Sequence, residues 1–440
     1  MITSQTNAEG HKRYYSYSYT DTRGYVYCQT EAGDTFVFEY DLYANLISEK
    51  NPAGDIKQTI YGVGGFPLKT IYPNNAFTVF DYDTFGFMTL QKDSEGVTYK
   101  YIYNNNLLAA EIDPNNDSIT YQYDAAGNLL KITDKLGYER EYVYNSNGQK
   151  IQYKDKRGNI WYYTYNQYGY INSIEDPLNN ITYFDYDIIG NRISLTDANG
   201  YITQYFFDEL NRLLQTTYQD YTYKLRVYDA YNLLEETNEN GKTTSYLYDK
   251  NNRLVRITDA AGNYSEFEYD AAGNRISDKD KNSNITRYDY NTLGTHIEKD
   301  NPNQLIKITD AANNTISFQY DNMGNIISRC NKMGDTTYYE YDYLNQLTRI
   351  TNPLGNISTY AYDALGRKIC DTDALGNAVY YEYDKMDRIT KVTDAMNNSI
   401  QYEYDENGNR VKIIDAMSKE ISHTFNALNL LAEIKNPLNK

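Results

Sequence analysis

Residues 121–142 read YQYDAAGNLLKITDKLGYEREY, and this stretch decides the fold. Tyr121 and Tyr123 are two residues apart, so we expect them to share one face of a β-strand. Residues 124–127 and 134–137 combine Asp and Gly, which are typical of tight turns. The stretch therefore predicts a β-hairpin followed by a link to a further strand.

The same pattern recurs along almost the whole chain, with steps of mostly 21 residues between the aromatic residues that precede the first turn. A fixed period of this length indicates a tandem-repeat architecture. We call these residues the key aromatics, and they are Tyr19, Tyr40, Tyr61, Tyr82, Tyr103, Tyr123, Tyr144, Tyr165, Tyr186, Phe207, Tyr228, Tyr248, Tyr269, Tyr290, Tyr320, Tyr341, Tyr362, Tyr383, Tyr404 and Phe425.

The turns support this interpretation, because Gly, Asn or Asp stands four residues after nearly every key aromatic, at the first turn. A second turn shows the same preference seven residues before the next key aromatic. These residue types tolerate positive φ, as tight hairpin loops require. The positions expected to define the repeat are, in three of the units, Tyr123, Asp124, Gly127, Asp134, Gly137, Tyr269, Asp270, Gly273, Tyr404, Asp405 and Gly408.

One unit is irregular, because 30 residues separate Tyr290 from Tyr320. A nine-residue insertion would explain this spacing. We favour a twelve-residue deletion from two units, with the junction near Asn301 to Gln304, where we expect a local defect in the sheet.

The predicted fold is all-β, with tandem hairpins that form a long antiparallel sheet. A twisted, open sheet of about forty strands is too wide to stay flat. We therefore expect the sheet to coil into a spiral wall around a hollow. Aromatic residues also recur two positions before the key aromatics, as at Tyr142 and Tyr163, and predict a Tyr-rich face. Leu130 and Ile132 are expected to share a face of the returning strand.

Composition and charge narrow the functional classes. The chain has 52 Tyr, one Trp and a net charge of −18, with no basic cluster for nucleic acid. Cys28, Cys330 and Cys370 occupy unrelated repeat positions and suggest no disulfide or metal framework. The N-terminal residues lack the apolar core of a signal peptide, and no apolar run is long enough to span a membrane.

The units YDAAGNLLKITD, YDAAGNRISDKD, YDNMGNIISR, YDALGRKICDTD and YDENGNRVKIID closely resemble the RHS/YD-repeat family, which includes bacterial wall-associated and polymorphic-toxin proteins and animal teneurins. The resemblance implies a hollow β-shell that encloses a C-terminal toxin or effector domain of a secreted or cell-surface protein. The alternative to this shell function is a carbohydrate- or cell-surface-binding module, in which the Tyr-rich face binds glycans or cell-wall polymers.

The resemblance divides the chain into an irregular leader, residues 1–18, and an array of about 20 repeats, residues 19–440, that ends inside a turn of its last unit. The family's Pro- and Gly-rich terminal core motif and a non-repeat C-terminal segment are absent from this sequence. We therefore expect an excerpt of a longer array, with the guest polypeptide encoded downstream, although a free-standing binding module stays open.

No residue set points to catalysis. The three histidines, His11, His296 and His423, lie in the leader, the irregular unit and the last unit, away from any repeated nucleophile. Carboxylate pairs such as Asp124 and Asp134 recur in unit after unit as turn residues, whereas a glycosidase needs one cleft with two distinct carboxylates. Residues 405–409 resemble the start of a calcium loop without its distal Glu, and loose calcium binding remains a weaker alternative. We expect neither an enzyme nor a cofactor-dependent protein.

Overall fold

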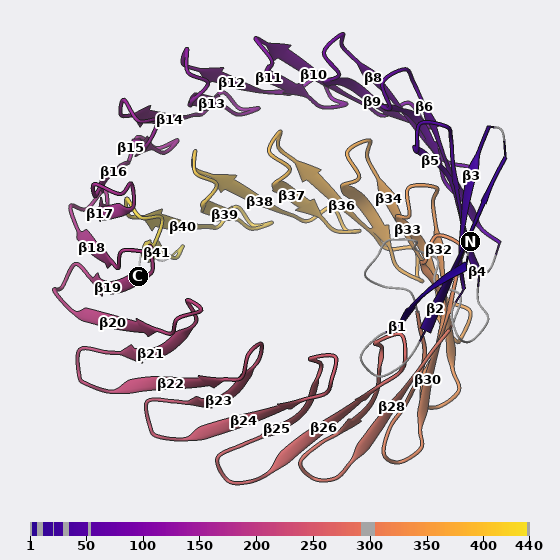
Figure 1. The fold of residues 1–440 in the computed structure, drawn as a ribbon. Coiled ribbons are helices and arrows are strands. Elements are labelled where there is room, and N and C mark those ends of the chain that lie inside the picture. The colour runs from indigo at the N-terminus through magenta and orange to yellow at the C-terminus, as the bar shows by residue number, and fades with distance from the viewer. Residues whose placement is uncertain are drawn as a thin grey trace. The chain divides into compact units, whose positions relative to one another are not determined.

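The computed structural model describes residues 2–6, 12–20, 22–29, 35–51, 54–291 and 304–437. These residues form 41 β-strands joined by turns, and the strands belong to one sheet (Figure 1). The prediction of an all-β fold built from tandem hairpins is confirmed.

The first half of the strands are β1 (Ile2–Thr6), β2 (Lys12–Tyr19), β3 (Gly24–Gln29), β4 (Thr35–Tyr40), β5 (Leu46–Lys50), β6 (Ile56–Tyr61), β7 (Pro67–Ile71), β8 (Phe77–Tyr82), β9 (Met88–Asp93), β10 (Thr98–Asn104), β11 (Leu107–Ile112), β12 (Ser118–Tyr123), β13 (Leu129–Thr133), β14 (Glu139–Tyr144), β15 (Lys150–Lys154), β16 (Ile160–Tyr165), β17 (Ile171–Glu175), β18 (Ile181–Tyr186), β19 (Arg192–Thr196), β20 (Ile202–Phe207) and β21 (Leu213–Thr217). The second half are β22 (Tyr223–Tyr228), β23 (Leu233–Thr237), β24 (Thr243–Tyr248), β25 (Leu254–Thr258), β26 (Tyr264–Tyr269), β27 (Arg275–Lys279), β28 (Ile285–Tyr290), β29 (Leu305–Thr309), β30 (Thr315–Tyr320), β31 (Ile326–Cys330), β32 (Thr336–Tyr341), β33 (Leu347–Thr351), β34 (Ile357–Tyr362), β35 (Lys368–Thr372), β36 (Ala378–Tyr383), β37 (Ile389–Thr393), β38 (Ser399–Tyr404), β39 (Arg410–Ile414), β40 (Glu420–Phe425) and β41 (Leu431–Lys435).

Each repeat contributes two antiparallel strands, as β12 and β13 show. Thr120 pairs with Thr133 and Tyr121 with Ile132, and the register then shifts at Tyr123, which pairs with Leu129. The shift is a β-bulge, which leaves Leu129 and Leu130 opposite one key aromatic. The sequence pattern missed this bulge, and Leu130 is exposed whereas Ile132 is half-buried.

Two steps of the repeat are 20 residues because their first turns are shorter. After β10, Asn105 and Asn106 both have positive φ and make a two-residue hairpin. After β22, the backbone N–H of Asp229 bonds to the carbonyl of Asn232, only three residues on. Such small changes in turn length leave the strand pairing of the repeat intact.

The irregular unit keeps the strand pairing of an ordinary repeat. β28 pairs directly with β29, and Tyr290 pairs with Leu305. The N–H of Asn291 bonds to the carbonyl of Gln304, as the corresponding pair does across the shorter first turn of ordinary repeats. An insertion and a deletion can both leave β28 and β29 as neighbours, so the preferred interpretation of a deletion from two units stays a prediction. The proposed junction at residues 301–303 lies outside the described residues.

Contacts divide the chain into two compact units. Unit 1 comprises residues 1–98, 227–236 and 242–359, and unit 2 comprises residues 99–226, 237–241 and 360–440. Among the described residues no apolar side chain is buried, so the sheet has no conventional core. Its packing comes from cross-strand pairs, such as Tyr153 with Tyr142 and Trp161, whose ring centroids are 5.5 and 5.3 Å away.

Candidate functional surface

Both turns of a repeat share one backbone design. In the first turn of the unit quoted above, Asp124 Oδ1 accepts hydrogen bonds from the N–H groups of Ala126 and Asn128, each at 2.9 Å. Gly127 has a φ of 89°. These bonds satisfy the turn's donors and explain why Asp, or Asn, opens it. The hydrogen bonds with the Asn128 amide and backbone lower the pKa of Asp124.

The second turn repeats this geometry. Asp134 Oδ1 accepts from the N–H groups of Leu136 and Tyr138 at 2.9 and 3.0 Å, and Gly137 has a φ of 88°. Asp134 is buried and also pairs with Lys156, which lies in the second turn of the next repeat. The second turns are therefore linked to each other from repeat to repeat.

The two other units chosen from the sequence follow the same geometry. Asp270 and Asp405 each accept a 2.8 Å hydrogen bond from the N–H four residues on. Gly273 and Gly408 both have a φ of 94°. Positive φ is a property of the turn position itself, since Ala44, Tyr221, Ser283 and Ser418 also adopt it there.

The key aromatics join consecutive repeats. The hydroxyl of Tyr269 donates to the carbonyl of Leu254 at 2.9 Å, and that of Tyr404 donates to Ile389 at 2.8 Å, 15 residues earlier in each case. The same bond is made by Tyr165, Tyr290, Tyr320, Tyr341 and Tyr383. Tyr123 lies half-buried at its bulge. These seven hydroxyls therefore bind the protein's own backbone.

Arginines five residues after a key aromatic add a second link, which the sequence reasoning missed. Arg388 Nε donates to Asp384 Oδ2 at 2.7 Å, and its Nη1 donates to the carbonyl of Asp405 at 3.3 Å. Its guanidinium also lies 4.5 Å from the ring centroid of Tyr404. In the sequence, Arg or Asn often follows directly after the Gly or Asn of the first turn. This recurrence was the signal from which the second link could have been predicted.

The opposite face of the sheet carries exposed tyrosines in consecutive repeats. Tyr162 pairs with Gln152 and Glu175, and Tyr183 pairs with Ser173 and Thr196, so both tyrosines share the face of these polar residues. Both stand three residues before a key aromatic and are exposed. The alternative function expected from the sequence, binding of glycans or cell-wall polymers, had been placed on the Tyr-rich face that carries the key aromatics.

In unit 2, turns far apart in the sequence contact each other. Arg157, in the second turn after β15, donates to the carbonyls of Phe425 and Asn426 at 3.0 and 3.2 Å. Asn407 Nδ2 donates to Asp155 Oδ2 at 2.6 Å. About 250 to 270 residues separate these partners, so within this unit the array returns alongside itself.

Unit 1 has comparable contacts made by amides. Asn74 Nδ2 donates to the carbonyl of Tyr343 at 3.1 Å, and Asn322 Nδ2 donates to that of Pro73 at 3.4 Å. Burial, together with Asp93 and Glu95, raises the pKa of Tyr343 to about 12. In unit 1, therefore, the second turn that contains Pro73 and Asn74 lies against the first turns that contain Asn322 and Tyr343.

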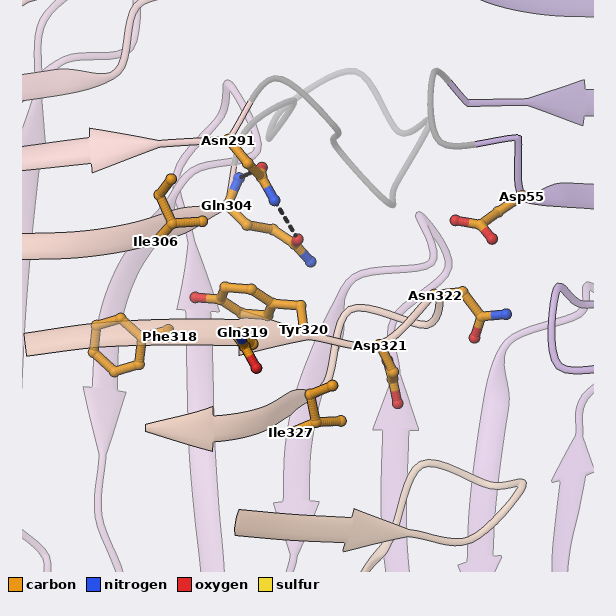
Figure 2. Close-up of a pocket in the computed structure, with 10 residues that line it drawn as sticks. All are labelled: Asp55, Asn291, Gln304, Ile306, Phe318, Gln319, Tyr320, Asp321, Asn322 and Ile327. Carbon is orange, nitrogen blue, oxygen red and sulfur yellow. Dashed lines mark hydrogen bonds between the residues drawn. The ribbon is translucent and has the colours of Figure 1, made fainter. Parts of the chain in front are cut away.

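A pocket of about 430 Å³ lies in unit 1, near the end of β28 and the start of β29 (Figure 2). Its lining includes Asn291, which follows β28, Gln304, which precedes β29, Tyr320 of β30 and Asp55, which precedes β6. The Asn291 amide bonds to Gln304 Oε1 at 3.0 Å, and the Tyr320 hydroxyl donates to Leu305 at 2.7 Å. These polar groups are engaged in the internal links of the array.

The remaining chemical candidates are scattered. His423 is half-buried on β40 with Nδ1 3.1 Å from the carbonyl oxygen of Arg410, and His11 and His296 lie outside the described residues. Cys28, Cys330 and Cys370 are free thiols. In the described ranges no three His, Cys, Asp or Glu side chains are grouped as metal ligands, and no helix is present that could cross a bilayer.

Comparisons with known proteins agree with this geometry. The Teneurin YD-shell family model matches residues 220–379 and 299–435, and the RHS Repeat model matches residues 103–139. No curated protein matches the sequence.

Several solved structures share the fold. A crystal structure of TcdB2-TccC3-TEV has a TM-score of 0.67 at 16% identity, over 99% of this chain and 28% of that one. A crystal structure of TcdB2-TccC3 gives 0.65 at 16%, over 99% and 30%, and a Tc holotoxin pore from Photorhabdus luminescens gives 0.61 at 15%, over 99% and 31%. This chain thus spans less than a third of the length of each of these chains. It belongs to the RHS/YD-repeat family, and its fold is that of the TcdB2-TccC3 structures.

Proposed function

We propose that this chain is a non-catalytic wall segment of a β-shell that encloses a toxin or effector polypeptide of a secreted or cell-surface protein. The observation that carries the proposal is a sheet without a buried apolar side chain among its described residues, which is held together by links between neighbouring repeats. Such a sheet leaves both of its faces available for contact with another polypeptide. It can therefore enclose that polypeptide without a specific binding cleft. The likeness to Tc toxin structures that are named with TEV or Cdc42 supports the same role.

Limited proteolysis of the natural product tests this role. The polypeptide that contains the array is identified by mass spectrometry from its source and then treated with trypsin. We expect its non-repeat segments to be cut only when the array unfolds. Cleavage of those segments as fast as in isolation, or a product composed of the array alone, would overturn the proposal.

A second candidate function is binding of glycans or cell-wall polymers. Tyr162 and Tyr183 favour it, because they are exposed and share one face, and Tyr162 lies between Gln152 and Glu175, which can hydrogen-bond to sugar hydroxyls. Aromatic rings in such settings stack on sugar rings. Retention on a cell-wall glycan column should fall when both tyrosines are changed to Ala, and should survive Val143→Ala on the same face. Equal retention of all three proteins would exclude this surface.

A further inference from the structure

The docked turns of unit 2 contact each other through charged side chains. The second turns after β11, β13 and β15 lie against the first turns after β36, β38 and β40, and we call this set of contacts the seam. Besides the Arg157 bonds described above, the pairs that cross the seam include Arg157 with Asp405 at 3.5 Å, Lys385 with Asp117 at 2.7 Å, Lys135 with Asp387 at 3.8 Å and Asn407 with Asp155 at 2.6 Å. Each of these pairs contains at least one charged group.

The docked turns of unit 1 meet through uncharged groups. The side-chain amides of Asn74 and Asn322 donate to backbone carbonyls at 3.1 and 3.4 Å. Asp93 and Glu95 there face the phenol of Tyr343, which stays uncharged because its pKa is raised to about 12. Salt screens the attraction between opposite charges, so it should weaken the seam of unit 2 far more than these amide contacts.

Several charged groups of the seam also have partners within their own edge of the sheet. Lys135 lies 2.7 Å from Asp113, and Arg367 donates to Asp387 at 2.9 Å. Asp155 accepts hydrogen bonds from two backbone N–H groups of its own turn. Breaking a buried ion pair is most costly where it leaves a charge without a partner. Separation of the two edges would leave none of these three groups in that state.

The bonds that build the sheet itself are of another kind. Neighbouring strands are joined by backbone pairing, as β14 and β15 are from Glu141 with Lys154 to Tyr144 with Lys150. Backbone N–H and carbonyl groups carry no net charge, so screening leaves this pairing intact. The two edges can therefore separate at the seam while the strands on both sides stay paired.

We propose that the seam of unit 2 is an ionic lock, which opens reversibly while the hairpins on both sides stay folded. Opposite charges hold it closed at low ionic strength, and added salt releases it. Salt reaches these pairs because the side chains of Lys385 and Asp387 are 56% and 48% exposed. The docked turns of unit 1 stay closed under the same conditions, because their contacts are uncharged.

An open seam gives a polypeptide a passage between two edges of the sheet. For an enclosed polypeptide this passage is an exit that requires neither cleavage nor unfolding of the wall. The exit rests on the proposed shell function, whereas the ionic lock is a property of the array itself. Limited proteolysis tests the enclosure and distance measurements test the lock, so either idea can fail without the other.

Distances between spin labels test the lock in the full chain, with Cys28, Cys330 and Cys370 changed to Ser. The labels replace exposed residues on the two sides of the docked turns, through Arg140→Cys with Leu430→Cys in unit 2 and Lys92→Cys with Leu344→Cys in unit 1. Raising NaCl from about 0.01 M to about 1 M shortens the Debye length from ~30 to ~3 Å. We expect a second, longer distance for the unit 2 labels alone, unchanged circular dichroism, and return of the short distance on dilution of the salt.

Removal of the seam's cations should open it without salt. Lys135→Gln, Arg157→Gln and Lys385→Gln, combined in one protein, should give the longer unit 2 distance already at low salt. Lys332→Gln is the control, because Lys332 pairs with Asp310 along one edge of the sheet, and this variant should respond to salt as the parent does. An unchanged unit 2 distance at high salt, equal changes in both units, loss of circular dichroism on opening, or a triple variant that stays closed would overturn the proposal.

Discussion

The Tyr404 hydroxyl lies 2.8 Å from the carbonyl oxygen of Ile389, and this hydrogen bond ties one hairpin to the preceding one. The same 15-residue relationship recurs in units far along the chain, as from Tyr165 to Lys150. The constant spacing gives the tyrosine of the repeat a physical role that its aromatic ring alone does not explain.

Removing the hydroxyl should therefore loosen the contact between repeats. We expect Tyr404→Phe to destabilise the surrounding repeats by about 0.5–1.5 kcal/mol, because the Ile389 carbonyl loses its side-chain donor. Hydrogen exchange of β37–β39 should accelerate accordingly. Tyr380→Phe is the control, since Tyr380 is exposed and its hydroxyl makes no hydrogen bond to the described residues. Equal effects of the two substitutions would show that the hydroxyl bond contributes nothing.

Backbone conformation predicts opposite signs for two turn substitutions. Ser418 has a φ of 62°, so Ser418→Gly should stabilise its turn by up to about 1 kcal/mol. Gly273 has a φ of 94° and open space where a Cβ would lie, so Gly273→Ala should cost about 1–2 kcal/mol through strain alone. Urea denaturation followed by circular dichroism measures both. A destabilised Ser418→Gly protein would contradict the assignment of strain to this position.

Arg157 should hold the docked turns of unit 2 together through geometry as well as charge. Arg157→Lys keeps the charge but loses the simultaneous donation to Phe425 and Asn426. We expect amide exchange in β40 and β41 to accelerate by about tenfold, which corresponds to ~1.4 kcal/mol. Arg287→Lys, an exposed arginine without a hydrogen bond to the described residues, should leave exchange unchanged. Unaltered protection of β40 in the Arg157 variant would count against this contact.

Tyr121 should make the array sensitive to alkaline pH. Burial, and secondly the hydrogen bond to Glu111, raise the pKa of Tyr121 to about 12. The unfolded value is about 10, so its contribution to stability is complete below pH ~10 and is lost as the pH rises toward 12. The tyrosinate absorbance difference between the parent and Tyr121→Phe reports this titration. Glu111→Gln should move it part of the way to 10, because burial remains, and an ordinary pKa in the parent would refute the cause.

Much of this architecture follows from short stretches of sequence. The 21-residue period, the Asp or Asn that opens each turn and the Gly four residues after Tyr123 or Tyr404 are all visible in the chain itself. Turn chemistry and strand alternation are local, so residues 121–142 were enough to predict hairpins with positive φ at Gly127 and Gly137. The sequence also identified the family through the repetition of these units.

Only the tertiary structure decided how the repeats are joined. The bulge at Tyr123 depends on how two strands pair, and it makes Leu129 instead of Leu130 the partner of this key aromatic. The direct pairing of β28 with β29 across the irregular spacing is likewise visible only in the folded sheet. The contact of Arg157 with Phe425, 268 residues away, depends on the accumulated twist and curvature of many strands. No short stretch of sequence encodes this accumulated twist and curvature. The sequence therefore determined the repeat, and only the folded array decided which distant turns contact each other.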